Sequence, residues 1–107
     1  MKLIMAIVNN DDANRVQKAL ATEGFSVTKL ATTGGFLMAG NTTFIAGTED
    51  ERVEHFFEIL RKFSKRRLEK IETINISDGA FIPPTSTEIM VGGATVFVMN
   101  IERYEKM

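Results

Sequence analysis

The residues best suited to binding chemistry lie in one glycine- and threonine-rich stretch, ATTGGFLMAGNTTF at residues 31–44. Glycines let a backbone approach a ligand closely and present its N–H groups to oxyanions. The threonine hydroxyls and the amide of Asn41 are neutral donors and acceptors that suit a phosphate or a base edge. Phe36 and Leu37 add an apolar surface for an aromatic ring. The stretch therefore has the composition of a nucleotide site without a strong cation, or of a hairpin connection whose threonines bond their own backbone.

Two further features lie outside this stretch. Gly92 and Gly93 interrupt a long apolar segment, and two glycines in a strand mark either a bulge or the close approach of a ligand or another backbone. The run RKFSKRR at 61–67 concentrates positive charge at the end of a predicted helix, where cations offset the helix dipole. We interpret this run as a solvated basic face, with attraction of an anionic ligand or an acidic partner as the alternative.

Residues that could perform catalysis are scarce. The chain has one histidine, His55, and no cysteine, which excludes thiol catalysis, Cys-ligated zinc and a metal site with two histidines from one chain. We expect His55 on the surface of a helix, and no serine lies in a nucleophile motif that could use it as a base. No generic phosphate-binding fingerprint is present, and none of residues 28–47 is acidic. We therefore predict a binding protein with no catalytic residue, metal or cofactor.

The first half of the chain has a strand–helix–strand order. Residues 2–8 form a nearly continuous apolar run typical of a buried strand. From Asp11, apolar residues recur at three- and four-residue spacing, which predicts a helix that Gly24 ends. Residues 25–31 alternate between apolar and polar types and predict a second strand.

The second half repeats this order. It predicts a strand at 42–47, a capping box at 48–51 formed by Thr48 and Glu51, and a helix at 53–63. A weak strand at 68–76 and a last strand at 89–99 follow. Two β-α-β units of similar length predict an α+β sandwich of the ferredoxin-like type, with one antiparallel sheet and two helices on one face. Because the strands at 2–8 and 89–99 are apolar on both alternations, we expect the other face to pack against other subunits.

Length and charge narrow the class of protein. The 107 residues predict one domain, 1–107. With 13 basic and 14 acidic residues the net charge is −1, so no overall field attracts a nucleic acid polymer or an anionic membrane. No apolar run reaches the roughly 18 residues of a membrane span, and the apolar start is too short for a signal peptide. These observations predict a cytoplasmic protein that binds neither nucleic acid polymers nor membranes.

Three segments of the chain carry a family resemblance. They are TKLATTGGFL at 28–37, GNTTF at 40–44 and VGGATVFV at 91–98. Together they resemble the PII-like cyclic-di-AMP receptor family of Gram-positive bacteria, and the similarity extends over nearly the whole chain. The resemblance implies a homotrimer of ferredoxin-like subunits that binds three cyclic-di-AMP molecules in clefts between neighbours. It also implies a signalling role without catalysis, with an effector protein that the sequence does not identify.

The resemblance also indicates which residues would hold the dinucleotide. Seven positions match those that do so in the family: Thr28, Gly35, Phe36, Leu37, Asn41, Gly47 and Phe97. Gly92, in the third segment, is a further candidate for ligand contact.

The chain departs from the family pattern at three places. Ser26 stands where an arginine is usual, the stretch at 75–87 is shorter and altered, and residues 105–107 replace a terminal His-Gln-Phe. The loss of a charge-assisted hydrogen bond at position 26 would cost about 1–3 kcal/mol of binding energy. The loss of arginine at position 26 and the altered stretch at 75–87 support one alternative, a PII-like sensor of another adenine nucleotide such as ATP or ADP.

Overall fold

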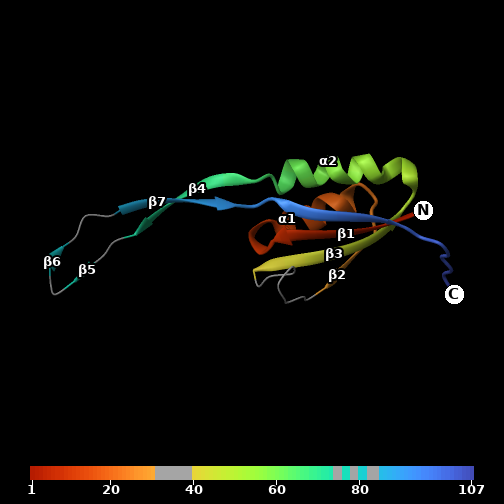
Figure 1. Ribbon diagram of the computed structural model, residues 1–107, viewed down its shortest axis with the longest axis horizontal. Helices are drawn as coiled ribbons and strands as arrows, with labels where there is room; N and C mark the ends of the chain where they lie inside the picture. Colours follow the sequence, from red (N-terminus) through yellow and green to blue (C-terminus); the bar gives the residue numbers. More distant parts are fainter. Residues whose placement is uncertain (31–39, 74–75, 78–79, 82–84) are drawn as a thin grey trace.

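The computed structural model describes the backbone of residues 1–30, 40–73, 76–77, 80–81 and 85–107, and the side chains of 1–30, 40–68 and 90–107. The body is a four-stranded antiparallel sheet with strand order β2-β3-β1-β8 (Figure 1). Its strands are β1 (Lys2–Asn9), β2 (Val27–Leu30), β3 (Asn41–Thr48) and β8 (Ala94–Asn100). Two helices, α1 (Asn10–Thr22) and α2 (Val53–Phe63), pack on this sheet. The arrangement is compatible with the predicted ferredoxin-like fold.

The core lies between the two helices and one face of the sheet. Strand alternation sends Ile4, Ala6 and Val8 of β1 to the same side, and all three are buried. Phe44 and Ala46 of β3 join them in one apolar cluster. The other buried members of the cluster come from α1, from α2 and from the residue that precedes β2 by two positions: Ala13, Val16, Leu20, Phe56, Ile59, Leu60 and Phe25. Both helices therefore cover the same face of the sheet.

The ends of α1 follow from its sequence. The side chain of Asn9 accepts a hydrogen bond from the backbone N–H of Asp11 at 2.9 Å, which satisfies one free donor of the first turn. Gly24 follows the helix with φ at 84°, a conformation that glycine adopts without a Cβ clash. The predicted helix and its glycine end are confirmed.

The predicted capping box is wrong. Thr48 is the last residue of β3, where it pairs with Lys2 and is buried. A single 3-10 turn, Asp50–Arg52, separates the strand from α2, and the residue before that turn makes no side-chain capping hydrogen bond. Pairing with β1 thus keeps Thr48 in the sheet, while α2 spans Val53–Phe63, the range predicted for this helix.

The remaining strands form an arm. Strands β4 (Arg67–Thr73) and β7 (Thr85–Val91) pair with each other and extend away from the sheet and helices (Figure 1). The short strands β5 (Ile76–Ser77) and β6 (Ala80–Phe81) pair beyond them. The weak strand signal at 68–76 is thus confirmed for most of its length, and the molecule measures 66 Å along its longest axis.

The prediction of one strand at 89–99 is wrong. Gly92 and Gly93 have φ values of 79° and 85°, which turn the chain out of the extended conformation. As a result, β7 ends at Val91 in the arm, and β8 begins at Ala94 in the main sheet, where it pairs with β1. One apolar segment therefore serves two sheets.

Candidate functional site

Cross-strand pairing aligns two candidate residues in one row. Residues directly opposite each other in antiparallel strands point to the same side of the sheet. Thr28 lies opposite Ile45, and Ile45 lies opposite Met5. Met5 in turn lies opposite Phe97. The row crosses all four strands, with Thr28 and Phe97 on the two edge strands.

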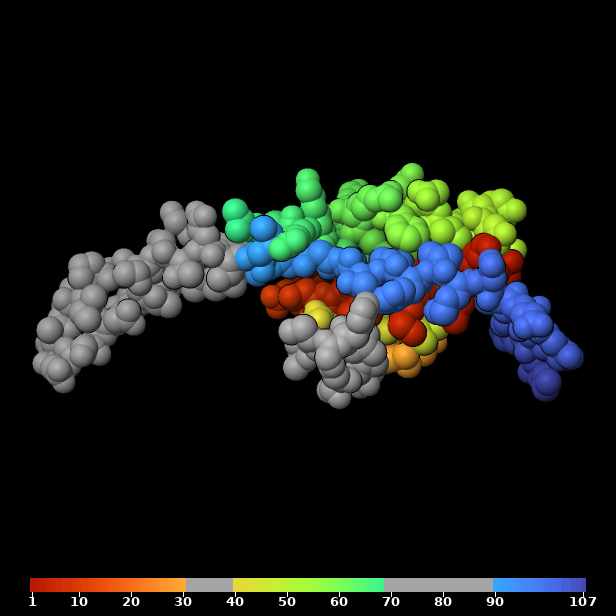
Figure 2. All heavy atoms as spheres, in the orientation of Figure 1, coloured from red at the N-terminus to blue at the C-terminus, as the bar shows by residue number. Residues whose placement is uncertain are grey.

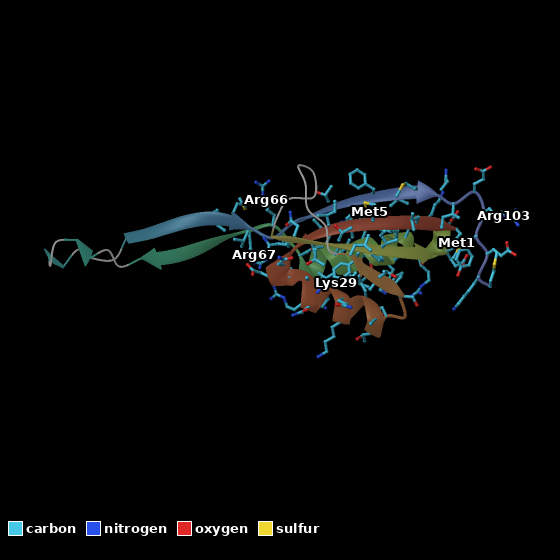
Figure 3. All side chains as sticks on the ribbon, turned by 90° about the horizontal axis from the view of Figure 1, so that it is seen from below. Met1, Met5, Lys29, Arg66, Arg67 and Arg103 are labelled. Carbon is cyan, nitrogen blue, oxygen red and sulfur yellow. The ribbon has the colours of Figure 1, made fainter. Side chains whose placement is uncertain are left out.

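This row belongs to the face of the sheet that the helices do not cover. Met5 follows the buried Ile4, so its side chain points away from the core and from α1 (Figure 3). Gly47 follows the buried Ala46 and lies on the same face, as does Asn41 by the same alternation along β3. The structure therefore places four of the predicted residues, Thr28, Asn41, Gly47 and Phe97, on one face. We call it the open face.

The open face is apolar. Leu3, Met5 and Ile45 are partly exposed there, and Phe97 and Met99 of β8 are 39% and 40% exposed. Figure 2 shows β8, in blue, running along the surface of the body beside α2 and β1. A contiguous group of exposed large apolar side chains on an edge strand marks a surface that contacts another protein or a ligand.

Asn41 begins β3 at a point held by the first residue of α1. The backbone N–H of Asn10 donates to the carbonyl oxygen of Gly40 at 2.8 Å. The hydroxyl of Thr42 donates to the side-chain oxygen of Asn10 at 2.6 Å. Both neighbours of Asn41 are thus fixed to α1, which sets the position of Asn41 at this end of the sheet. The candidates Gly35, Phe36 and Leu37 lie outside the described residues.

A buried ion pair lies beside this end of the sheet. Asp12 is fully buried, and its carboxylate accepts hydrogen bonds from Arg67, at 2.9 and 3.3 Å, and from Arg15. Burial alone would raise the pKa of Asp12, but the hydrogen bonds and positive charges of Arg67 and Arg15 outweigh it and lower the pKa below the ordinary 3.8. Asp12 is therefore a charged anchor at the start of α1.

Gly92 lies against this ion pair. A Cβ at this position would come within 2.6 Å of Nη1 of Arg67, 2.7 Å of the carbonyl oxygen of Lys65 and 3.1 Å of Oδ2 of Asp12. A glycine is therefore required at position 92 for two reasons: a Cβ would clash with these neighbouring atoms, and the positive φ is a conformation that other residues rarely adopt. Contact between Gly92 and a ligand stays a prediction.

Sequence reasoning missed Asp12 and assigned Arg67 only to a basic face. Arg61, Lys62, Lys65 and Arg66 are exposed, as the solvated-face interpretation predicts, but Arg67 is partly buried by its contact with Asp12. An acidic residue on the apolar side of α1 was the available signal, because Asp12 lies four residues before the buried Val16.

His55 lies on the outer surface, as predicted. Its side chain is 42% exposed, with Nε2 at 3.2 Å from Oε2 of Glu23 and Nδ1 at 3.5 Å from Oε2 of Glu58. Within the part of the chain that the structure describes, no three His, Asp or Glu side chains gather closely enough to hold a metal ion. Nor is any helix there both long and apolar enough to cross a membrane.

The two larger grooves described on the surface include none of the described candidate residues, although one of them includes Gly93, the neighbour of Gly92. The groove between α1 and α2 has a volume of about 480 Å³, and its apolar lining residues are Ala19, Ile59 and Phe63. The groove between α2 and β8 has a volume of about 700 Å³ and includes Gly93 and Val96. Thr28, Asn41, Gly47 and Phe97 thus share the open face and line neither of these two grooves.

Comparison with known proteins gives the family. A family model described as cyclic-di-AMP receptor matches residues 1–107. The chain is also similar to a protein of unknown function from Pediococcus pentosaceus, whose crystal structure it matches at 39% sequence identity and a TM-score of 0.78, over 99% of this chain and 96% of that one.

The family description concerns receptors, which are binding and signalling proteins and not enzymes. It names cyclic-di-AMP and does not favour the alternative of an ATP or ADP sensor. Because the match extends over the whole chain, as the three sequence segments predict, this protein belongs to the cyclic-di-AMP receptor family.

Proposed function

We propose that this protein is a cytoplasmic PII-like signalling protein that binds cyclic-di-AMP at the interfaces of a homotrimer. Occupancy would be relayed to an effector protein by rearrangement of the loops at 32–41 and 75–87. The observation that carries the proposal is the position of Thr28 and Phe97, which lie on the same face but on opposite edge strands of the sheet.

The width of the sheet supports a site between subunits. Neighbouring strands lie about 4.8 Å apart, so three strand spacings separate Thr28 from Phe97 by roughly 14 Å within one chain. In a ring of copies in which the β2 edge of one subunit meets the β8 edge of the next, Thr28 of one chain approaches Phe97 of its neighbour. Such head-to-tail contacts close into a ring when the rotation between copies is 120°.

The composition of the open face supports the trimer. Assembly around this face would remove Met5, Ile45 and Met99 from water, and burying apolar area stabilises an interface by about 25 cal/mol per Å² before the costs of association. A domain of this size has a small core, so the added burial would also stabilise the subunit.

Each candidate residue would make a contact suited to its chemistry. The hydroxyl of Thr28 and the amide of Asn41 would hydrogen-bond a phosphate or an adenine edge. The ring of Phe97 would contact an adenine face, and Gly47 would let the backbone of β3 approach the ligand. Gly35, Phe36, Leu37 and Gly92 would complete the site by their match to the family.

Two measurements test this function together. Isothermal titration calorimetry with cyclic-di-AMP should give saturable binding with one ligand per chain, and cyclic-di-GMP and ATP should bind more weakly. Sedimentation equilibrium should give the mass of a trimer. The absence of saturable cyclic-di-AMP binding at micromolar concentrations would contradict the ligand, and a monomer at those concentrations would contradict the shared site.

A further inference from the structure

A side-chain contact lies at the base of the arm, beside the backbone hydrogen bond that the N–H of Gly93 donates to the carbonyl oxygen of Ser64. Arg67 is the first residue of β4, and its guanidinium donates to both carboxylate oxygens of Asp12, at 2.9 and 3.3 Å. Its Nη1 also donates to the carbonyl oxygen of Lys65 at 3.1 Å. On the returning side of the arm, Gly92 leaves no room for a Cβ beside the same guanidinium. The Asp12–Arg67 pair therefore lies between the two chain segments that join the arm to the body.

The same turn of α1 holds the start of β3. Asn10 donates from its backbone to Gly40 and accepts from the hydroxyl of Thr42. Only two positions along the helix separate Asn10 from Asp12. The base of the arm and the residues on either side of Asn41 are thus fixed to one short, rigid segment of the chain, residues 10–12.

We propose that Asp12 is a positioning residue that fixes the direction of the arm relative to the sheet and couples that direction to the start of β3. The coupling rests on the proposed function, because Asn41 is one of the candidate ligand contacts. Two hydrogen bonds between a guanidinium and a carboxylate restrict orientation as well as distance. Separating the pair would leave the fully buried carboxylate of Asp12 with Arg15 alone, and a buried charge that loses a partner is costly. A change in the direction of the arm that keeps this pair intact therefore has to move the first turn of α1 as well.

The distance between the arm and the body tests this proposal directly. The chain has no cysteine, so Ala21→Cys, on the exposed end of α1, and Thr73→Cys, the last residue of β4, give one unique pair of spin labels. Pulsed electron paramagnetic resonance measures the distribution of distances between them, with labelled chains diluted in unlabelled protein. Because β4 is roughly 20 Å long at about 3.4 Å per residue, a tilt of about 20° moves its end by about 7 Å.

Four substitutions in the labelled protein separate positioning from mere stabilisation, all measured without nucleotide. R67Q and D12N should broaden the distribution of distances or shift its maximum by about 5 Å or more, because the length of β4 turns a small tilt at its base into a displacement of that size at its end. R67Q also covers the case in which D12N does not fold, because Asp12 keeps Arg15 as a partner. The matched controls R66Q and D11N remove the same charges from exposed neighbouring residues and should leave the distribution unchanged. A distribution that is the same in R67Q, in folded D12N and in the parent would overturn the proposal.

Cyclic-di-AMP then tests the coupling. Added nucleotide should shift the distribution in the parent and shift it less in R67Q. An equal shift in both proteins, or no shift in a parent that calorimetry shows to be saturated, would overturn the coupling. Lack of nucleotide binding by the parent would contradict the proposed function but not the positioning role, which the nucleotide-free measurements decide.

Discussion

Replacing Asp12 by asparagine is the most informative test of how the body is stabilised. The asparagine keeps the shape of the side chain and one oxygen acceptor, so the substitution removes charge without opening a cavity. In the parent, the buried carboxylate accepts two hydrogen bonds from Arg67 and one from Arg15. Breaking a fully buried ion pair costs about 3–5 kcal/mol. Here the side chains of Arg67 and Arg15 are 35% and 58% exposed and can regain water, so we expect D12N to lower the free energy of unfolding by about 2–3 kcal/mol.

The pH dependence of this loss has a definite sign. Burial alone would raise the pKa of Asp12. The hydrogen bonds and positive charges of Arg67 and Arg15 have the opposite and larger combined effect, so the pKa of Asp12 in the folded state is below 3.8. A carboxyl group of this kind contributes stability above its unfolded pKa and loses that contribution as the pH falls through its folded pKa. The difference in unfolding free energy between parent and D12N should therefore be complete at pH 7 and pH 5 and should shrink below about pH 3.8.

Urea denaturation followed by circular dichroism measures this difference at each pH. Parent and variant are compared at one protein concentration, because any association of subunits also contributes to the measured stability. The control D11N removes an exposed carboxylate from the same helical turn and should cost less than about 1 kcal/mol. A D12N loss below about 0.5 kcal/mol at pH 7, or a loss that stays constant down to pH 3, would refute the role of the buried pair, since the bonds invoked are worth more than that.

Three further substitutions test other parts of the structure. Gly92→Ala should destabilise the protein more than Gly93→Ala in urea denaturation. Both glycines have a positive φ, which costs an alanine about 1–2 kcal/mol, but only a Cβ at 92 would come within 3 Å of Arg67 and Lys65, whereas the atom nearest to a Cβ at 93 is 3.6 Å away. Equal losses of stability in the two variants would contradict the close approach at Gly92. Met5→Asp places a charge on the open face and should convert a trimer to monomers in sedimentation experiments. The control Asn14→Asp adds the same charge to an exposed position on α1 and should leave the trimer intact. An intact trimer of Met5→Asp would exclude the open face from the interface. Thr28→Val removes one hydroxyl and should weaken cyclic-di-AMP binding about 5- to 10-fold in calorimetry. The control Thr22→Val removes a hydroxyl that donates to the carbonyl oxygen of Lys18 in the same helix, and it should leave the affinity unchanged. An unchanged affinity of Thr28→Val would exclude Thr28 from the site.

Local patterns predicted most of the body correctly. The apolar run at 2–8 became the strand β1, whose alternate residues Ile4, Ala6 and Val8 lie in the core. Gly24 ends α1 in the predicted way. Both predictions depend only on short-range periodicity and on the freedom of glycine to take positive φ, so neighbours along the chain were sufficient to make them.

The errors arose where distant pairing overrides local signals. Thr48 and Glu51 have capping-box spacing, but pairing with Lys2 keeps Thr48 in the sheet. The segment at 89–99 reads as one strand because both of its halves are apolar, and nothing local shows that the first half pairs with β4 and the second with β1. The change of partner takes place at the two glycines, which sequence reasoning identified as unusual.

The candidate site was predictable as a set of residues but not as an arrangement. That Thr28 and Phe97 share a face follows only from the register of three strand pairs. The pair of Asp12 and Arg67 joins residues that are 55 positions apart, and no local pattern specifies such a contact.

Mixing two defective variants tests most directly whether the site is shared between subunits. Thr28→Asp sets a carboxylate against the ligand phosphates, and Phe97→Ala removes a stacking surface worth about 1–3 kcal/mol, so trimers of either variant alone should bind cyclic-di-AMP poorly. If Thr28 of one chain and Phe97 of the next form each site, about one quarter of the sites in randomly co-assembled trimers combine two intact halves. Calorimetry of the co-expressed mixture should then show that fraction of sites binding with the parent affinity. A mixture that binds no better than either variant alone would place both residues in the site of a single chain and contradict the account.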